Sequence, residues 1–239
     1  LDSDRDGDPN DWNTGYSAAQ STQDLVIDTD DDNDGVVDVE DQFPLDPTET
    51  SDSDGDGVGD RSDAAPNDPA VQYLSLSEAL GSIADDALRN CVENQSQGFE
   101  SAGDLTSLEC SHRGVRSFEG LQSFPNLSDL NLDGADTQGQ ALDLSPLSGL
   151  GKLERLGIGW SWGNALDLSP LSGLKRLRYL HANGSRVSRI DALVGLPNLR
   201  ELYIGWSQIE DFSPLSEIKG LTNSQTNTNA NSAFIIWFI

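Results

Sequence analysis

The sequence predicts an α/β solenoid of stacked repeats, with a helical cap at its N-terminal end and an irregular acidic stalk before the cap. Two periodicities predict this architecture. Leucine-led units of 22 to 26 residues repeat over residues 105–221, and aspartate-rich blocks repeat with a 22-residue period within residues 1–70. We therefore expect four segments: acidic repeats at 1–70, a linker and cap helix at 71–104, leucine-led repeats at 105–221, and a polar tail with a short apolar C-terminus at 222–239.

The negative charge is concentrated in the first segment. Residues 1–70 carry 22 acidic and 2 basic side chains, a net charge of −20 out of −27 for the whole chain. This segment is also poor in leucine and aromatic residues, so it cannot bury an ordinary core. Divalent cations would supply the missing stabilisation through metal–oxygen bonds. The charge also makes nucleic acid and anionic membranes poor partners.

The second and third acidic blocks place carboxylates at loop positions 1, 3, 5, 9 and 12, with glycine at position 6. This spacing predicts calcium loops, in which position 7 offers its backbone carbonyl. A disordered acidic run, the alternative, would have no reason to keep glycine at one phase or to repeat at a fixed period. The first block departs from the pattern with Asn10 and Asn13 at positions 9 and 12. The predicted Ca²⁺ ligands are Asp2, Asp4, Asp6, Asp8 and Asn10 in the first block, Asp30, Asp32, Asp34, Val36, Asp38 and Asp41 in the second, and Asp52, Asp54, Asp56, Val58, Asp60 and Asp63 in the third.

Prolines follow each complete loop, at Pro44 and Pro66, and end any helix there. This argues against EF-hands, which need flanking helices, and against dockerins, which need a helix after each loop. The blocks resemble thrombospondin type 3 repeats of bacterial secreted proteins over residues 1–70, although residues 12–27 form an insertion without a metal pattern. The resemblance implies a calcium-laden string with little regular structure. Calcium loops of this kind work at millimolar calcium, so we expect an extracellular or cell-surface location.

Residues 71–104 contain the helical spacing expected of one short amphipathic helix, with Ser77 as a possible N-cap and Gly98 past its end. The chain has two cysteines, Cys91 within this segment and Cys110 after it. They are either a disulfide or two buried thiols, and the oxidising compartment expected for the chain favours the disulfide.

The leucine-led units begin at Leu105, Leu127, Leu153, Leu177 and Leu199, and Leu221 opens a sixth. Each reads L-x-x-L-x followed by Leu, Ile, Ala or Cys, and each ends with apolar residues three apart. A period-2 strand followed by a return segment of period 3 to 3.6 is the signature of a leucine-rich repeat coil. Separate amphipathic helices would not keep such short, regular spacing.

These units resemble the 22-residue repeats of internalins and related bacterial surface proteins over residues 77–221. The resemblance implies that Asp86–Cys91 belongs to an N-terminal cap, which a Cys91–Cys110 bond would attach to the first strand. One position departs from the family. Its ninth residue, often asparagine, is Arg113, Ala135, Ser161, Ser185 or Ser207. We expect the serine hydroxyls to satisfy only part of the backbone that an asparagine ladder would serve.

Binding is better supported than catalysis. Only two histidines occur, His112 and His181, and no catalytic motif is present, so we expect no enzyme activity. Positions 3, 5, 7 and 8 of each unit should project to the concave or adjacent face, where aromatic side chains are typical contact anchors. The predicted ligand-binding residues are Tyr179, His181, Tyr203, Trp160 and Trp206, alongside Arg155, Asp129, Asn131, Asp133, Asn183 and Glu201. For the two tryptophans an alternative stays open, in which they fold over the coil edge in place of the missing asparagine ladder.

Together these features predict a calcium-binding extracellular adhesion or recognition protein whose partner is a protein or a glycan. The alternative is a structural protein that self-associates into a surface layer or filament cross-linked by calcium. The apolar residues 233–239 leave three alternatives open: the start of a membrane anchor, an edge strand that closes the solenoid, or a cloning remnant.

Overall fold

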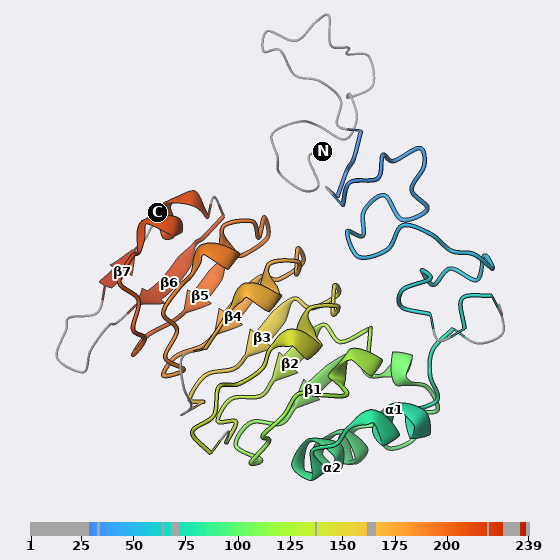
Figure 1. The fold of residues 1–239 in the computed structure, drawn as a ribbon, viewed down its shortest axis with the longest axis horizontal. Coiled ribbons are helices and arrows are strands. Elements are labelled where there is room, and N and C mark those ends of the chain that lie inside the picture. Colours follow the sequence, from blue (N-terminus) through green and yellow to red (C-terminus); the bar gives the residue numbers. More distant parts are fainter. Residues whose placement is uncertain are drawn as a thin grey trace, which may run out of the picture. The chain divides into compact units, whose positions relative to one another are not determined.

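The computed structural model describes residues 29–32, 34–63, 65–67, 72–136, 138–161, 166–218, 220–226 and 235–237 (Figure 1). The chain divides into two compact units, Leu1–Gln72 and Tyr73–Ile239. The described part of the first unit consists of turns and bends without helix or strand. Gly35 and Gly57, at position 6 of the two complete loops, have φ angles of 99° and 93°. Glycine adopts this left-handed conformation at no steric cost, which is why the sharp turn falls there.

The second unit is built on one sheet whose strands follow chain order, side by side (Figure 1). Strands β1 to β6 pair in parallel, and β7 pairs antiparallel with β6. The apolar C-terminal segment thus contains an edge strand, one of the three alternatives above. The strands are β1 (Ser107–Glu109), β2 (Asp129–Asn131), β3 (Arg155–Gly157), β4 (Tyr179–His181), β5 (Glu201–Tyr203), β6 (Asn223–Thr226) and β7 (Ile235–Trp237).

The register of the parallel strands aligns the same unit position in every coil. Leu108, Leu130 and Leu156 face one another across β1 to β3, and Leu180 and Leu202 continue the row. All five are at most 1% exposed. Fully burying a leucine contributes about 1.5–3 kcal/mol, so these stacked rows hold the coils together.

The return segments contain short 3₁₀ helices, which pack coil on coil. Three of them carry a Ser-Pro-Leu sequence with proline in the first turn, where its missing N–H is not needed. An aspartate two residues before each serine accepts a hydrogen bond from the serine backbone N–H; we call Asp143, Asp167 and Asp211 the turn aspartates. In the part of the chain that the structure describes, the 3₁₀ helices are Ala102–Asp104, which precedes the first unit, and Leu121–Ser123, Ser145–Leu147, Ser169–Leu171, Asp191–Leu193 and Ser213–Glu217 in the return segments.

The single cap helix predicted from the sequence is wrong, because two helices occur: α1 (Leu76–Ser82) and α2 (Asp86–Gln95). Ser75, not Ser77, is the N-cap of α1, since Ser75 and Glu78 form a reciprocal capping box. The chain then leaves helical geometry at Ile83, and the Asp85 carboxylate starts α2 by accepting from the Leu88 N–H. The segment expected to form one helix therefore contains two N-caps, Ser75 and Asp85, and each of them starts a separate helix.

Helix α2 is attached to the first strand in two ways. The predicted disulfide is confirmed, with Cys91 and Cys110 joined at a Cα–Cα distance of 5.9 Å. The Gln95 amide also pairs with the backbone of Glu109: its Nε2 donates to the carbonyl at 2.8 Å, and its Oε1 accepts from the N–H at 3.0 Å. A side chain therefore imitates a neighbouring strand at the β1 edge, which would otherwise present unpaired backbone groups.

Candidate metal centres and binding surface

The two complete acidic loops fold in the same way. At position 1, Asp30 accepts hydrogen bonds from the Asp34 and Gly35 N–H groups at 3.2 and 3.0 Å. Asp52 likewise accepts from the Gly57 N–H at position 6, at 2.9 Å, and also from the Gly55 N–H at position 4, at 2.7 Å. The carboxylate of position 1 thus gathers the backbone of the loop around itself, as expected for a loop that wraps a centre.

The carboxylates at positions 1, 3 and 5 converge in each loop. Oxygen atoms of Asp30, Asp32 and Asp34 lie within 4.8 Å of one another, and those of Asp52, Asp54 and Asp56 do the same. One oxygen is buried without a hydrogen-bond partner at positions 3 and 12 of both loops and at position 5 of the third-block loop. These atoms are Asp32 Oδ2, Asp41 Oδ2, Asp54 Oδ2, Asp56 Oδ2 and Asp63 Oδ2.

Burial and neighbouring negative charges both act on Asp32 in the second-block loop. Burial, followed by the charges of Asp34, Asp41 and Asp30, raises the pKa of Asp32 to about 7. Buried carboxylate oxygens without partners are costly unless a cation or donor compensates them. Several carboxylate oxygens around one centre are the ligand set that Ca²⁺ takes, so the residues at positions 1, 3, 5 and 12 fit this ion.

Position 9 has a different part in the described loops. Asp38 accepts from the Asp31 N–H at 2.8 Å, and Asp60 accepts from the backbone and hydroxyl of Ser53 at 2.7 Å. Backbone and side-chain hydrogen bonds from Ser53, with the Ser51 hydroxyl, hold the pKa of Asp60 below its ordinary value. These two carboxylates close their loops and lie outside the convergent triplets. The carbonyls of Val36 and Val58 stay predicted ligands, and the first block, Asp2 to Asn10, lies outside the described residues.

Glu49 is an acidic residue that the loop spacing did not reveal. It is 6% exposed, its Oε2 accepts from the Arg61 N–H at 3.1 Å, and its Oε1 has no hydrogen-bond partner. A Cβ atom on Gly59 would lie 2.1 Å from Glu49 Oε2. The close approach of the Glu49 carboxylate therefore requires a glycine at position 59. Glu49 lies between the two calcium-loop motifs, so the spacing of the motifs gives no sign of it.

The second unit presents a solvent-facing surface along its strands, because residues alternate between buried and accessible along β1, β2, β4 and β5. We call this surface, made by positions 3, 5 and 7 of the five units, the open face. Its residues are Ser107, Glu109, Ser111, Asp129, Asn131, Asp133, Arg155, Gly157, Gly159, Tyr179, His181, Asn183, Glu201, Tyr203 and Gly205.

Aromatic and charged side chains form one contact series across β2 to β5. The guanidinium of Arg155 lies 3.3 Å from the Asp129 carboxylate and 4.2 Å from the centre of the Tyr179 ring. Tyr179 in turn contacts Tyr203 with ring centres 5.5 Å apart, and the Tyr203 hydroxyl donates to Glu201 at 3.1 Å. The structure thus brings together the two tyrosines that the sequence singled out.

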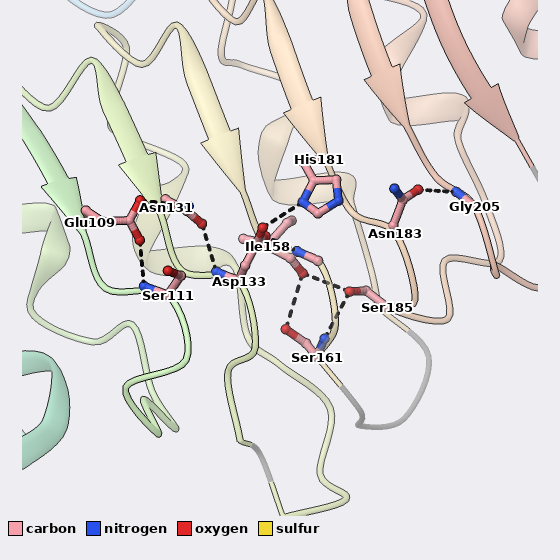
Figure 2. Close-up of polar contacts among 11 residues, drawn as sticks. Glu109, Ser111, Asn131, Asp133, Ile158, Ser161, His181, Asn183, Ser185 and Gly205 are labelled. Carbon is pink, nitrogen blue, oxygen red and sulfur yellow. Dashed lines mark hydrogen bonds and ion pairs between the residues drawn. The ribbon is translucent and has the colours of Figure 1, made fainter.

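His181 is held by a residue two coils away. Its Nδ1 lies 2.8 Å from Asp133 Oδ2, and both side chains are about one-sixth exposed (Figure 2). The intervening coil has glycine at both facing positions. A Cβ on Gly157 would lie 3.1 Å from Asp133 Oδ1, and a Cβ on Gly159 would lie 2.6 Å from His181 Cε1. The glycines of coil 3 therefore make room for this pair, which we call the Asp133–His181 clasp.

Several polar residues of the open face serve the backbone. Figure 2 shows N–H groups at position 7 bound by side chains, Ser111 by Glu109, Asp133 by Asn131 and Gly205 by Asn183, at 2.5–3.0 Å. The Gly159 N–H is bound by Asp133 in the same way, at 2.6 Å. Asn131, Asp133 and Asn183 were predicted as part of a binding surface. In the structure they hold the ends of the strands, a function that strand periodicity alone does not reveal.

The two tryptophans meet over a glycine. Trp160 and Trp206 occupy position 8 with φ angles of 56° and 53°, and their ring centres lie 5.2 Å apart. Gly184, at position 8 of the coil between them, is also left-handed, and a Cβ there would lie 2.8 Å from Trp160. Left-handed geometry is uncommon for bulky residues. Trp206 is 42% exposed, so the pair forms an accessible aromatic surface beside the open face.

The serines at position 9 replace the asparagine ladder only in part, as expected. The Ser161 and Ser185 hydroxyls both donate to the Ile158 carbonyl, at 3.2 and 2.8 Å, and Ser185 Oγ also accepts from the Ser161 N–H at 3.3 Å (Figure 2). Ser207 is 2% exposed, and its hydroxyl has no hydrogen-bond partner. In coils 3 and 5 the tryptophan at position 8 directly precedes the serine at position 9.

The stacked coils define a leucine-rich repeat solenoid. Residues 175–217, which span β4 and β5 with their return segments, match the family model described as Leucine Rich repeats (2 copies). No curated protein matches the chain significantly.

Solved structures similar to the chain include two internalins from Listeria monocytogenes. One is 25% identical over 62% of this chain and 57% of its own, with a TM-score of 0.36. The other, an internalin C2, is 24% identical over 62% of this chain and 96% of its own, with a TM-score of 0.34. A TDR receptor is 23% identical over 50% of this chain and 22% of its own, with a TM-score of 0.42. The chain spans little more than half of the first internalin. Within the described residues, no helix is long and apolar enough to cross a membrane.

Proposed function

We propose that the protein is a calcium-binding extracellular recognition protein, in which the leucine-rich repeat solenoid binds a partner protein through its open face. The observation that carries this proposal is the contact series Arg155–Tyr179–Tyr203–Glu201, which places two aromatic rings and two charged groups on a sheet surface directed to solvent. Tyrosine and arginine are enriched among the residues that dominate binding energy at protein interfaces.

The packing of these side chains against one another favours a role in binding. Each tyrosine is packed against a neighbour on the sheet, so little side-chain entropy remains to be lost when a partner docks. The Trp160–Trp206 pair extends the aromatic area at the ends of the same coils. On the open face, Asp129 pairs with Arg155, Asp133 with His181 and Glu201 with the Tyr203 hydroxyl, which fixes these side chains further.

Recognition is tested by capture on arrays of extracellular proteins and glycans, in millimolar calcium and again with chelator. We expect a defined protein hit that Tyr203→Ala abolishes with little change in melting temperature. Arg189→Ala is the matched control, because Arg189 lies off the open face with its side chain 82% exposed. A hit that both variants retain would place binding elsewhere, and silence on all arrays would contradict the recognition proposal.

The proposed role of calcium is to rigidify the acidic unit. Each ion would hold carboxylates from positions 1, 3, 5 and 12 of one loop, and would compensate the buried oxygens that have no other partner. Titration calorimetry of chelator-treated protein should show binding that Asp32→Asn and Asp54→Asn each reduce by one site. The turn-aspartate variant Asp167→Asn, with the same loss of charge, should bind as the parent does.

Calcium removal should leave the solenoid folded, because its core is made of leucine rows in the second unit. Heating with chelator is therefore expected to preserve the cooperative transition of the solenoid. Complete loss of that transition would show that the two units are not energetically separate. Size-exclusion chromatography at rising concentration tests the alternative of self-association, which predicts a concentration-dependent increase in mass.

A further inference from the structure

We propose that the open face binds a basic segment, rich in arginine or lysine, of its partner protein. This inference rests on the proposed function and names the chemistry of the partner. It is argued from the charge of the face, from an internal example of the interaction, and from the arrangement of carboxylates beside aromatic rings.

The open face carries more negative than positive side chains, and most basic side chains of the second unit lie elsewhere. It carries four carboxylates, on Glu109, Asp129, Asp133 and Glu201, and one guanidinium, on Arg155. Residues 71–239 contain 12 basic side chains in total, so 11 of them lie off this face. Complementary charge steers association and selects partners by sign. A polyanion would be repelled from this surface, whereas a basic segment would be attracted to it.

Arg155 shows how the face accommodates a cation. Its guanidinium is paired with the Asp129 carboxylate at 3.3 Å and lies over the Tyr179 ring at 4.2 Å. A guanidinium over an aromatic face gains from the ring quadrupole, and a carboxylate at its edge adds a charge-assisted hydrogen bond. The geometry needed for an incoming arginine is thus already realised within the chain.

A carboxylate and a tyrosine ring also lie together in the next coil. The Tyr203 ring contacts Tyr179, and its hydroxyl donates to the Glu201 carboxylate at 3.1 Å. At the other end of the face, Glu109 accepts from the Ser111 N–H and the Asn131 amide. Burial raises the pKa of Glu109, but these hydrogen bonds outweigh burial and the pKa is lowered, so this carboxylate is charged at neutral pH.

A neutral glycan fits these observations less well. It would stack on the tyrosines, but it would gain nothing from the excess of carboxylates. A basic protein segment uses both groups, because its arginine or lysine side chains can sit between a ring and a carboxylate while its apolar residues cover Trp160 and Trp206. The glycan remains an outcome that the test must be able to report.

The test uses the full chain in millimolar calcium and a synthetic peptide of alternating arginine and leucine. Matched peptides replace every arginine by glutamine or by glutamate. The face variant Glu109→Gln/Asp129→Asn/Glu201→Gln removes three charges and keeps the hydrogen-bond acceptors. The matched control Asp143→Asn/Asp167→Asn/Asp211→Asn removes three charges from the turn aspartates, off the open face. Circular dichroism and melting temperature verify that both variants are folded.

We expect the arginine peptide to bind the parent chain and the control variant equally, and to bind the face variant at least about tenfold more weakly. Binding should weaken with rising salt, and the glutamine and glutamate peptides should not bind. Equal weakening in both variants would overturn the inference, because it would show general attraction to an acidic chain. Equal binding of the glutamine peptide would overturn it as well.

The outcomes separate this inference from the proposed function. An array hit that Tyr203→Ala abolishes and the face variant retains would leave recognition established and the basic partner refuted. A glycan hit with the same behaviour would assign the face to sugar stacking instead. Absence of every array hit, together with absence of peptide binding, would refute both.

Discussion

Gly159→Ala tests whether the missing side chains of coil 3 are what allow the Asp133–His181 clasp. The added Cβ would lie 2.6 Å from His181 Cε1 and 3.1 Å from the Asn183 carbonyl oxygen. The imidazole must therefore move, and the 2.8 Å contact with Asp133 must break or lengthen. The backbone carbonyl of Asn183 cannot move freely, since it accepts from the Trp160 N–H at 2.6 Å.

The expected cost follows from these two contacts. Overpacking of a well-packed site costs typically 1–3 kcal/mol, roughly the range in which the loss of a hydrogen bond to a charged group also falls. For a domain of 150–250 residues, each kcal/mol lowers the melting temperature by about 2–4 °C. We expect Gly159→Ala to lower the melting temperature of the solenoid by at least about 2 °C, measured by calorimetry in millimolar calcium.

Two further variants decide whether the clasp is the cause. Gly173→Ala is the matched control, since its Cβ would meet nothing closer than the Ser148 carbonyl oxygen at 3.9 Å. In a His181→Ala background the clash with the imidazole is gone, so Gly159→Ala should cost less there, as a double-mutant cycle would show. An equal cost in both backgrounds would refute the reasoning.

Three further predictions concern stability. Replacing Cys91 and Cys110 by serine should lower the free energy of unfolding by about 3 kcal/mol, according to the loop-entropy relation for a loop of this size. The loss should appear as a lower melting temperature. An unchanged melting temperature would mean that Gln95 alone holds α2 on β1. Acidification should destabilise the solenoid below about pH 4, because hydrogen bonds from the following serines hold the pKa of each turn aspartate below the ordinary 3.8. This stability is present above the unfolded-state pKa and is lost as the pH falls through the folded-state pKa, so the triple asparagine variant should show a flatter acid profile. Ser185→Ala should cost about 1 kcal/mol, whereas Ser207→Ala should be neutral or stabilising, since only the Ser185 hydroxyl has hydrogen-bond partners; equal costs in urea unfolding would contradict this.

The parts of this protein that repeat could be predicted from the sequence. Leucines at fixed positions imply a strand that buries every second residue, and the structure places Leu108, Leu130 and Leu156 side by side as that pattern requires. Aspartates at alternate positions with a glycine at the sixth imply a loop that turns its carboxylates inward, and the convergence of Asp30, Asp32 and Asp34 agrees. Both patterns are local, because each follows from the geometry of a few consecutive residues.

The cap helices show where local patterns are insufficient. The apolar spacing from Leu76 to Leu88 fits one helix, but two N-caps compete with it, at Ser75 and Asp85. Capping depends on which side-chain oxygen reaches which N–H group, and several serines and aspartates in this segment could have done so. The apolar periodicity predicts which face of a helix is buried, but it gives little information about where the helix is interrupted.

By itself the sequence determined the repeat architecture, the two acidic loops and the rows of residues that line the open face, because all of these depend on spacing along the chain. Only the tertiary structure decided which of those residues contact one another. Asp133 and His181 are 48 residues apart and meet because two glycines in the coil between them leave room. Trp160 and Trp206 meet over Gly184 for the same reason. Such contacts depend on the stacking of three coils and on the absence of a side chain in the middle one, which no single repeat can specify.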